Sequence, residues 1–484
     1  MLHDDGELYY KKTKLTISEI ALLKMNYWRC QKHRYNHLMK KILALLLYLS
    51  LTTQTHAAGF IRDAEIEGDV RKLAAPIFRS AGLDPAGVRI FIVQDDSINA
   101  FVAGGQNIFL HIGLLLACET PEMLLGVIAH ETGHIAGGHI ARGAEAISRA
   151  QIGTVISYVL GAVAFAHGAG NVGMAVLSGG SSTVERSMLS FSRTNEDSAD
   201  QAALRFLNQN HISADGMLAM FEKLRREEKR HFDKIDPYIL THPLGPERIA
   251  NIRDAVKNSP YGKNKLPAQE QERHKRMLAK LIGFLQPLNA VLLQYPSSDN
   301  SPAAHYARAV AWYRSSDLTR SLSELDGLIK AAPKDAYFYE LKGQILFENA
   351  RINESVKAYE QAIKLAPNEP LIRTGYAQSL LANNQPMMAA KELERASKED
   401  NSYNLIWRLL AESYGKIGQN GMAQMALAEM SMLENDAKLA NQHAEIALKT
   451  LPKNSPHWYR VSDIQAQAKR MMAEKNSGID DKNR

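Results

Sequence analysis

Apolar residues recur with the period of a helix along most of the chain and with the period of a strand in one short region. The stretch "GFIRDAEIEGDVRKLAAPIFRSAGL", from Gly59, has the helical spacing of apolar residues, and the predicted helix ends at Gly82. "VRIFIVQDD" and "INAFVAGGQNIFLHIGLLL" then have the character of β-strands, with Gly104 and Gly105 as the turn of a hairpin. The pattern predicts one helix followed by a small β-sheet.

A second helix is predicted after the hairpin. Thr120 offers a capping hydroxyl and Pro121 suits the first helical position, so "PEMLLGVIAHETGHIAGGHI" should form a helix. The later apolar run Ile152–Phe165 is shorter than the roughly 20 residues that span a bilayer. It predicts a buried helix, and a surface that dips into lipid is the alternative.

The chain repeats itself from about residue 300. Pro333 and Pro367 lie 34 residues apart, each after an apolar helix. This is the tetratricopeptide period, in which paired helices approach closely at small residues and stack into a solenoid with a concave binding surface. Small residues recur at that period, with a large residue three positions after each: Ala309, Gly343, Ala377 and Ala411, then Trp312, Leu346, Leu380 and Tyr414.

These patterns predict an α+β chain that is mostly helical, with a small β-sheet in its first domain and an all-α tetratricopeptide solenoid after it. The stretch "LPAQEQERHKRML" between them is interpreted as a polar hinge that leads into a connecting helix. The predicted bounds are a presequence over 1–57, the first domain over 58–270, the repeats over 271–470 and a polar tail over 471–484.

The presequence resembles a secretory signal. Met39 and two lysines precede the apolar run Ile42–Leu51, and "TTQTHAA" follows, with cleavage expected after Ala57. A buried core helix is the alternative, and residues 1–38 would be an odd extension, so translation is expected to start at Met39. The signal predicts export to the periplasm.

Charge and cysteine content argue against a nucleic-acid-binding protein and against a fold stabilised by an internal disulfide. Nine of the 58 basic and four of the 52 acidic residues lie in residues 1–57, which leaves 49 basic and 48 acidic side chains and no basic surface for nucleic acid. Cys30 lies in the presequence, so Cys118 has no partner for an internal disulfide. We interpret Cys118 as a small core residue rather than a nucleophile.

The predicted second helix contains the motif H-E-x-x-H. His130 and His134 are four residues apart, so both imidazoles lie on one helix face and can bind one ion. Zinc suits two imidazoles and a carboxylate and leaves a position for water. The metal lowers the pKa of that water and Glu131 removes its proton, which predicts hydrolysis. A chance occurrence of the motif is the alternative.

The third ligand must come from elsewhere in the chain. A metzincin would need histidine where Ile140 stands, and His139 is one residue too early, so we interpret it as a nearby polar residue. In "TNEDSADQAALRFL", Glu196 is the candidate ligand, and Asp200, one turn later, would orient a ligand histidine. A solvated helix start is the alternative for this pair.

With "NEDSADQAA", "INAFVAGGQNIFLHIGLL" and "THPLGPERI", the motif resembles the gluzincin metalloproteases of the HtpX and CAAX-prenyl-protease type. The resemblance implies a zinc metalloprotease domain with one Zn²⁺ per chain. It also implies an edge strand at Asn99, Ala100 and Phe101 that pairs with substrate backbone, although Phe101 is equally well interpreted as core.

Two further roles are implied only by the resemblance. His242 would occupy the open position on the metal and keep the enzyme latent, or steady the oxyanion once its loop moves. Arg248 would pair with a carboxylate near the site, with a surface salt bridge as the equal alternative.

The sequence thus predicts a periplasmic zinc-dependent endopeptidase with a chaperone-like role. By resemblance, its clients are stalled or misfolded outer-membrane β-barrel proteins, and its repeats contact the barrel assembly machinery. One rival is a tetratricopeptide chaperone or scaffold whose metal site is latent or structural. The second rival is a membrane-embedded protease. A protease that contacts the membrane only at its surface is a weaker version of this second hypothesis.

Overall fold

The computed structural model describes residues 59–139, 182–230, 238 and 242–480. Residues 1–59 and 60–484 form two units, and the account that follows concerns the second. The predicted secretory signal and the apolar run Ile152–Phe165 lie outside the described residues. None of the described helices is long and apolar enough to cross a membrane.

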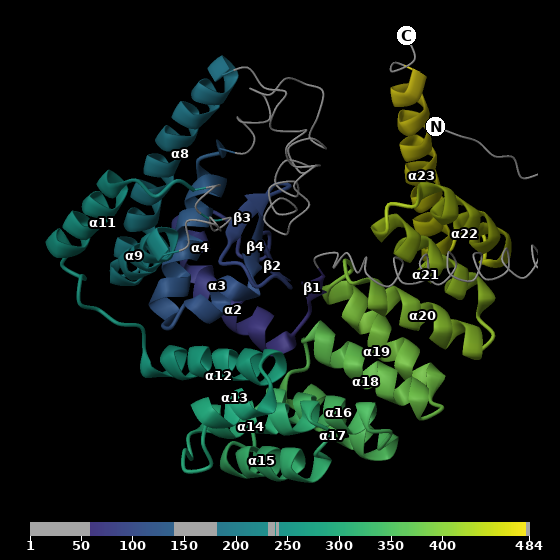
Figure 1. Ribbon diagram of the computed structural model, residues 1–484. Helices are drawn as coiled ribbons and strands as arrows, with labels where there is room; N and C mark the ends of the chain where they lie inside the picture. The colour runs from purple at the N-terminus through teal and green to yellow at the C-terminus, as the bar shows by residue number, and fades with distance from the viewer. Residues whose placement is uncertain (1–58, 140–181, 231–237, 239–241, 481–484) are drawn as a thin grey trace, which may run out of the picture. The chain divides into compact units, whose positions relative to one another are not determined.

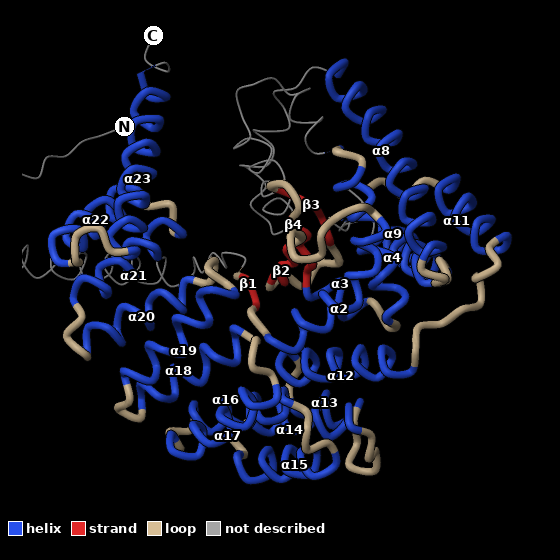
Figure 2. The backbone as a smooth tube through the Cα atoms, turned by 180° about the vertical axis from the view of Figure 1, so that it is seen from behind, coloured by secondary structure: helices blue, strands red, loops and turns tan. Residues whose placement is uncertain are grey.

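Four strands form one mixed sheet in the order β1-β2-β4-β3. β3 and β4 are antiparallel and form the predicted hairpin, in which Gly104 and Gly105 have φ angles of 60° and 96° that favour glycine. β2 runs parallel to β4 and antiparallel to β1. The sheet is confined to one region of a largely helical chain (Figure 2). The strands are β1 (Phe60–Ile61), β2 (Arg89–Val93), β3 (Ala100–Ala103) and β4 (Asn107–His111).

The strand prediction was wrong after residue 111, because Ile112–Ala117 forms the short helix α3. Gly113 packs so closely on the preceding loop that a Cβ atom there would lie 2.1 Å from the carbonyl oxygen of Asp96, and its amide donates to the Asp95 carbonyl at 3.1 Å. This contact turns the chain out of the sheet. A short apolar run does not distinguish a buried strand from a buried helix.

Helix α4 (Pro121–Ala136) lies in the middle of the first domain, packed on α8 and α9 (Figure 1). Thr120 caps it as predicted, accepting a hydrogen bond from the Met123 amide at 3.4 Å. The helix ends four residues earlier than predicted, and Gly138 follows with a φ of 61°. The other helices of this domain are α2 (Ala64–Ser80), α8 (Ser182–Gln209), α9 (Asp215–Arg230) and α11 (Pro246–Asn258).

The predicted polar hinge was also wrong, because helix α12 (Ala268–Leu285) covers most of it. One face of α12 is buried through Met277 and Leu281, and the His274 Nε2 atom lies 2.6 Å from the carbonyl oxygen of Cys118. Glu272 and Lys275 of this stretch are exposed, whereas Arg276 is partly buried and contacts Glu65 of α2. A helix that buries only a narrow apolar stripe has a largely polar sequence.

The remaining helices form the predicted repeats, in pairs that contact their neighbours along the chain. In four repeats, the turn between the two helices of the pair contains one residue in the left-handed conformation. These residues are also 34 apart: Ser316, Ala350, Asn384 and Gly418, with φ of 62°, 58°, 56° and 76°. Their bounds are α13 (Leu288–Gln294), α14 (Pro302–Arg314), α15 (Leu318–Ala331), α16 (Ala336–Glu348), α17 (Ile352–Leu365), α18 (Pro370–Ala382), α19 (Pro386–Glu399), α20 (Asn404–Lys416), α21 (Asn420–Leu433), α22 (Ala437–Thr450) and α23 (Pro456–Asp480).

Candidate metal centre

Helix α4 presents two histidines to one point. His130 is fully buried and His134 is 8% exposed, and their Nε2 atoms lie 3.1 Å apart. Helix α4 can approach α8 this closely because residue 133 is glycine. A Cβ atom at Gly133 would lie 2.7 Å from the carbonyl oxygen of Ala199 in α8. The close approach of these two helices brings the next ligand candidate to the histidine pair.

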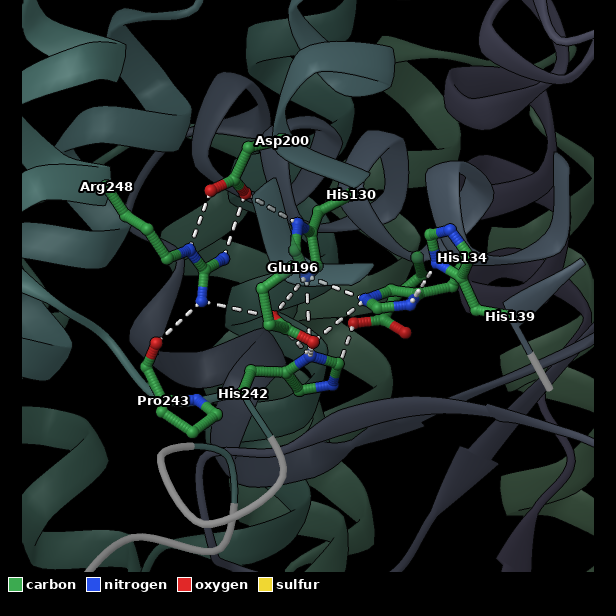
Figure 3. A network of polar contacts seen from close by, with 9 residues as sticks. His130, His134, His139, Glu196, Asp200, His242, Pro243 and Arg248 are labelled. Atoms are coloured by element: carbon green, nitrogen blue, oxygen red, sulfur yellow. Dashed lines mark hydrogen bonds and ion pairs between the residues drawn. The ribbon is translucent and has the colours of Figure 1, made fainter. Parts of the chain in front are cut away.

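Glu196 of α8 faces both histidines (Figure 3). One of its carboxylate oxygens lies 3.3 Å from the His130 Nε2 atom, and the other lies 3.3 Å from the His134 Nε2 atom. His242, in the loop before α11, approaches from another side. Its Nδ1 atom lies 3.3 Å from the His130 Nε2 atom and 3.1 Å from both Glu196 oxygens.

The spacing of these atoms fits a metal ion. Ligand atoms about 2.0–2.1 Å from a tetrahedral zinc ion stand about 3.3–3.4 Å from one another. The contacts just described among the four residues fall at 3.1–3.3 Å, and one ligand atom from each lies within 4.8 Å of all the others. The cluster is formed by His130, His134, Glu196 and His242, all buried.

Glu131 is a second observation that favours a bound group. Its carboxylate is fully buried, and neither oxygen has a hydrogen-bond partner within the described residues. Leaving such a group unpaired in the interior is costly. Its Oε1 atom lies 3.5 Å from the His242 Nε2 atom, so the carboxylate faces the cluster without being one of its four members.

A layer of charged residues supports the cluster. The His130 Nδ1 atom lies 2.8 Å from an Asp200 oxygen, and Arg248 donates to both Asp200 oxygens at 2.7 and 2.9 Å. Arg248 also contacts Glu196 at 3.0 Å and donates to the Pro243 carbonyl at 2.8 Å. Arg248 is 6% exposed, so this contact is buried rather than a surface salt bridge.

Residues 60–256 match the family model described as peptidase family M48, and residues 346–412 match a tetratricopeptide repeat model. The matched M48 region contains the whole buried cluster. Residues 60–256 are therefore an M48 peptidase domain, and tetratricopeptide repeats follow it.

Several relatives of the peptidase are named. The Beta-barrel assembly-enhancing protease of Escherichia coli (strain K12) is 26% identical over 380 residues, covering 77% of this chain and 77% of that protein. The protein of the same name in Yersinia pestis is 25% identical, with 77% of each chain covered. Metalloprotease LoiP of Escherichia coli (strain K12) is 32% identical over 36% of this chain and 63% of that protein. Among solved structures, the tetratricopeptide protein YrrB is 12% identical, covering 47% of this chain and 99% of that chain, with a TM-score of 0.27.

The carboxylates of the site are held ionised. Burial raises the pKa of Glu196, but its contacts with His242, His130 and His134 outweigh burial and hold that pKa well below its usual range. Burial likewise opposes ionisation of Asp200, and its bonds to His130 and Arg248 lower its pKa. Ionised carboxylates beside imidazole nitrogens are the donor set that zinc prefers.

Of the three predicted edge-strand residues, Ala100 and Phe101 lie in β3, Asn99 comes just before it, and none belongs to the four-residue cluster. β3 is the edge strand next to β4, and it contacts α4. Asn99 and Ala100 are buried, and within the described residues the Asn99 Oδ1 atom has no hydrogen-bond partner. Phe101 is partly buried and stacks on Phe109 with ring centroids 4.8 Å apart. Its ring therefore belongs to the outer face of the sheet.

Two other predictions concern residues near the centre. His139 lies outside the four-residue cluster, and its Nδ1 atom is 3.1 Å from the His134 Nδ1 atom, as expected for a nearby polar residue. Cys118 is a fully buried free cysteine, and burial raises the pKa of its thiol to about 12, which does not suit a nucleophile.

One contact of His242 was missed from the sequence. The Tyr238 ring is fully buried and packs against the His242 imidazole at an interplanar angle of 31°, with centroids 4.6 Å apart. The His242 amide donates to the Tyr238 carbonyl at 2.7 Å. The only signal was an aromatic residue four positions before the histidine, which is common in ordinary cores.

Proposed function

We propose that this peptidase is a periplasmic zinc-dependent endopeptidase that supports the assembly of outer-membrane β-barrel proteins and degrades their stalled or misfolded forms. The observation that carries the proposal is the convergence of His130, His134 and Glu196 beside the unpaired carboxylate of Glu131. The relatives named Beta-barrel assembly-enhancing protease, which align over 77% of this chain, support the client class.

In this proposal His130, His134 and Glu196 would hold one zinc ion, and Asp200 and Arg248 would orient these ligands. Zinc supplies Lewis acidity, which polarises a peptide carbonyl and lowers the pKa of water. Glu131 accepts the proton of the attacking water and passes it to the nitrogen of the departing amine. Asp200 accepts from the His130 Nδ1–H, which keeps the Nε2 lone pair free for the metal.

His242 has the role of a latch. Its Nδ1 atom lies within 3.3 Å of both His130 and Glu196, where a fourth ligand belongs. A neutral imidazole there excludes water and keeps the peptidase inactive. When the loop withdraws, the imidazole is free to donate to the developing oxyanion. Arg248, which binds the carbonyl of Pro243, holds the latch loop against the site.

The substrate path follows from β3. Asn99, Ala100 and Phe101 would bind an extended substrate backbone by strand addition, which reads the backbone more than the side chains. An unassembled β-barrel protein exposes unpaired strands of this kind. The repeats would hold such a client or the assembly machinery, and the predicted signal over 39–57 would export the chain. We keep the domain bounds 58–270 and 271–470 as proposals.

A scaffold function is the alternative, and His242 is the observation that favours it. If the latch never opens, the metal serves structure and the repeats act as a chaperone. The two functions differ in what Glu131 does, because a scaffold has no need of a buried base.

The test is degradation of an unfolded outer-membrane β-barrel protein by the full chain and by Glu131→Gln. The proposal predicts that the parent cleaves the client, and that the variant binds the metal but loses at least about a hundredfold in rate, within the range for general-base removal. Equal support of barrel assembly by both proteins, with no cleavage by either, would establish the scaffold instead.

A further inference from the structure

Half of strand β2 has no partner on its outer side. β1 pairs with β2 only at Val93 and Ile92, through Phe60 and Ile61. β2 itself begins at Arg89, and β4 pairs with it along its whole length on the other side. Within the described residues, the outer edge of β2 from Arg89 to Phe91 therefore lacks a neighbouring strand.

The backbone groups of Ile90 point toward this open edge. The Arg89 amide donates to the Gln106 carbonyl on the β4 side at 3.0 Å. Because alternate residues of a strand direct their N–H and C=O groups to opposite sides, those of Ile90 face the β1 side. The Ile90 side chain is 5% exposed and belongs to the core, so only the backbone N–H and C=O groups of Ile90 face the open edge.

The short strand β1 does not extend along this edge. β1 is antiparallel to β2 and begins at Phe60, opposite Val93, which is the end of β2 farther from Arg89. Residues after Ile61 enter helix α2, where the Asp63 side chain accepts from the Ile66 amide at 2.9 Å as the helix cap. A strand that completes the ladder must therefore come from a different segment or molecule.

A cavity of about 400 Å³ lies in front of the open edge. The sheet forms one wall, and two turns of the solenoid, over residues 368–371 and 399–402, form others. Phe60 is 56% exposed at its rim and lies 5.5 Å from Phe91, which stacks on Phe109 at 5.0 Å. Phe91 and Phe109 are partly buried, and an aromatic row that is exposed at Phe60 favours apolar side chains of a partner.

Several charged groups around the cavity already have polar partners. Arg62 bonds to Glu67 at 2.8 Å and to Asp400 at 2.6 Å. Arg89 donates to the Asn107 Oδ1 atom at 2.9 Å. A charged ligand would have to break these pairs, whereas a neutral extended backbone would not. The open backbone edge and the aromatic rim therefore favour the same occupant.

We propose that this edge of β2 is a second docking site for substrate, which accepts an extended strand with apolar or aromatic residues at alternate positions. The guest strand lies antiparallel to β2 in line with β1, hydrogen-bonds to the Ile90 backbone and places its apolar side chains over Phe60 and Phe91. The site is at the side of the sheet opposite β3, so it holds a client away from the metal centre. Only the identity of the client, an unfolded β-barrel protein, rests on the proposed function.

The test uses a fluorescein-labelled peptide of about ten residues in which phenylalanine and threonine alternate, a length that spans the edge with room to shift register. Fluorescence anisotropy measures its binding to the full chain carrying Glu131→Gln, so that it is not cleaved. Phe60→Asp is expected to weaken binding roughly tenfold. Leu293→Asp is the matched control, because Leu293 is an apolar residue of α13 that is 86% exposed and lies outside the cavity lining. Equal affinity of the Phe60→Asp variant and the control would overturn the proposal.

A second measurement leaves the protein unchanged. Two versions of the peptide are N-methylated on alternate amides, one on the odd and one on the even positions. Strand addition predicts that one version binds at least about tenfold more weakly than the other, because only one set of amides faces the edge. If Phe60→Asp also weakens binding of the N-methylated peptide that binds more tightly, the difference between the two peptides arises at the β2 edge. Equal binding of both versions excludes strand pairing.

These outcomes separate the docking site from the proposed function. Loss of peptide binding in Phe60→Asp, with no client cleavage by the parent, would support the docking site and refute the protease. Cleavage by the parent with peptide binding unaffected by Phe60→Asp would support the protease and refute the docking site.

Discussion

At the scale of single residues, the proposed latch role of His242 is open to a direct test. Replacing it with alanine removes the Nδ1 atom that lies 3.1 Å from Glu196 and opens the fourth position to water. We expect His242→Ala to raise casein proteolysis several-fold, since casein offers an already extended substrate. The double variant His242→Ala/Glu131→Gln is the control and should be inactive. An unchanged or lower rate in the single variant would remove the latch from the account.

Asp200 permits a second prediction at this scale. It binds both the His130 Nδ1 atom and Arg248, so Asp200→Asn removes the charge that orients the ligand. Zinc affinity should fall by roughly 10–100-fold, the usual effect of losing such a partner. Competition with a chelator measures it. Asp197→Asn, an exposed position of the same helix, is the matched control. Equal zinc affinity of the two variants would contradict the orienting role.

The sequence predicted some residues of the centre more readily than others, for a geometric reason. His130 and His134 share one helix, so their spacing alone places both rings on one face. Glu196 required a choice among later carboxylates and rested on its pattern with Asp200. Tyr238 and the carbonyl of Pro243 meet His242 and Arg248 only through a loop conformation, and no local pattern encodes such a contact.

At the scale of elements, the α4–α8 contact is the one on which the centre depends. A methyl group at Gly133 would lie 2.7 Å from the Ala199 carbonyl, so Gly133→Ala must push the helices apart. We expect a loss of about 1–3 kcal/mol in the free energy of unfolding, together with weaker zinc binding. Gly327→Ala in α15 is the control. Nothing lies within 4 Å of its added Cβ, so it should be neutral or stabilising by up to about 1 kcal/mol. Chemical denaturation distinguishes the two, and equal effects would contradict the close contact.

Element types were predictable wherever the pattern was long. The 34-residue period predicted the helix pairs, because each pair must bury the same face against its neighbours. The prediction was wrong at Ile112–Ala117, where a tertiary contact of Gly113 turns an apolar run into a helix. The prediction was also wrong at α12, because this helix has few buried apolar residues and its sequence is mostly polar.

At the scale of the whole second unit, an ionic network joins the first domain to the repeats. Glu65 of α2 is fully buried and contacts Arg276 and Lys280 of α12 and the Tyr306 hydroxyl of α14. Lys280 also reaches Asp63 at 2.7 Å. Removing one partner of such a buried network leaves an uncompensated charge, so the network keeps the domains in one arrangement.

This junction predicts a dependence of stability on pH. Burial raises the pKa of Glu369, beside α2, from 4.5 to about 7, and the charge of Arg71 lowers it only in part. Since the folded pKa lies above the unfolded one, the carboxyl stabilises the fold below pH 4.5, and this contribution is lost as pH rises through about 7. Glu369→Gln should therefore be close to neutral at low pH and stabilising by about 1–2 kcal/mol near pH 8. Thermal unfolding at both pH values tests it, and a stabilisation that is equal at the two would contradict the shift.

The most direct test of the account is the zinc content of the purified chain, measured by elemental mass spectrometry beside Glu196→Ala. The account predicts about one zinc ion per parent chain, removable by a chelator together with proteolysis and restored with it, and a large loss of zinc in the variant. A parent chain without stoichiometric metal, or a variant that retains it in full, would contradict the claim that His130, His134 and Glu196 form a catalytic centre.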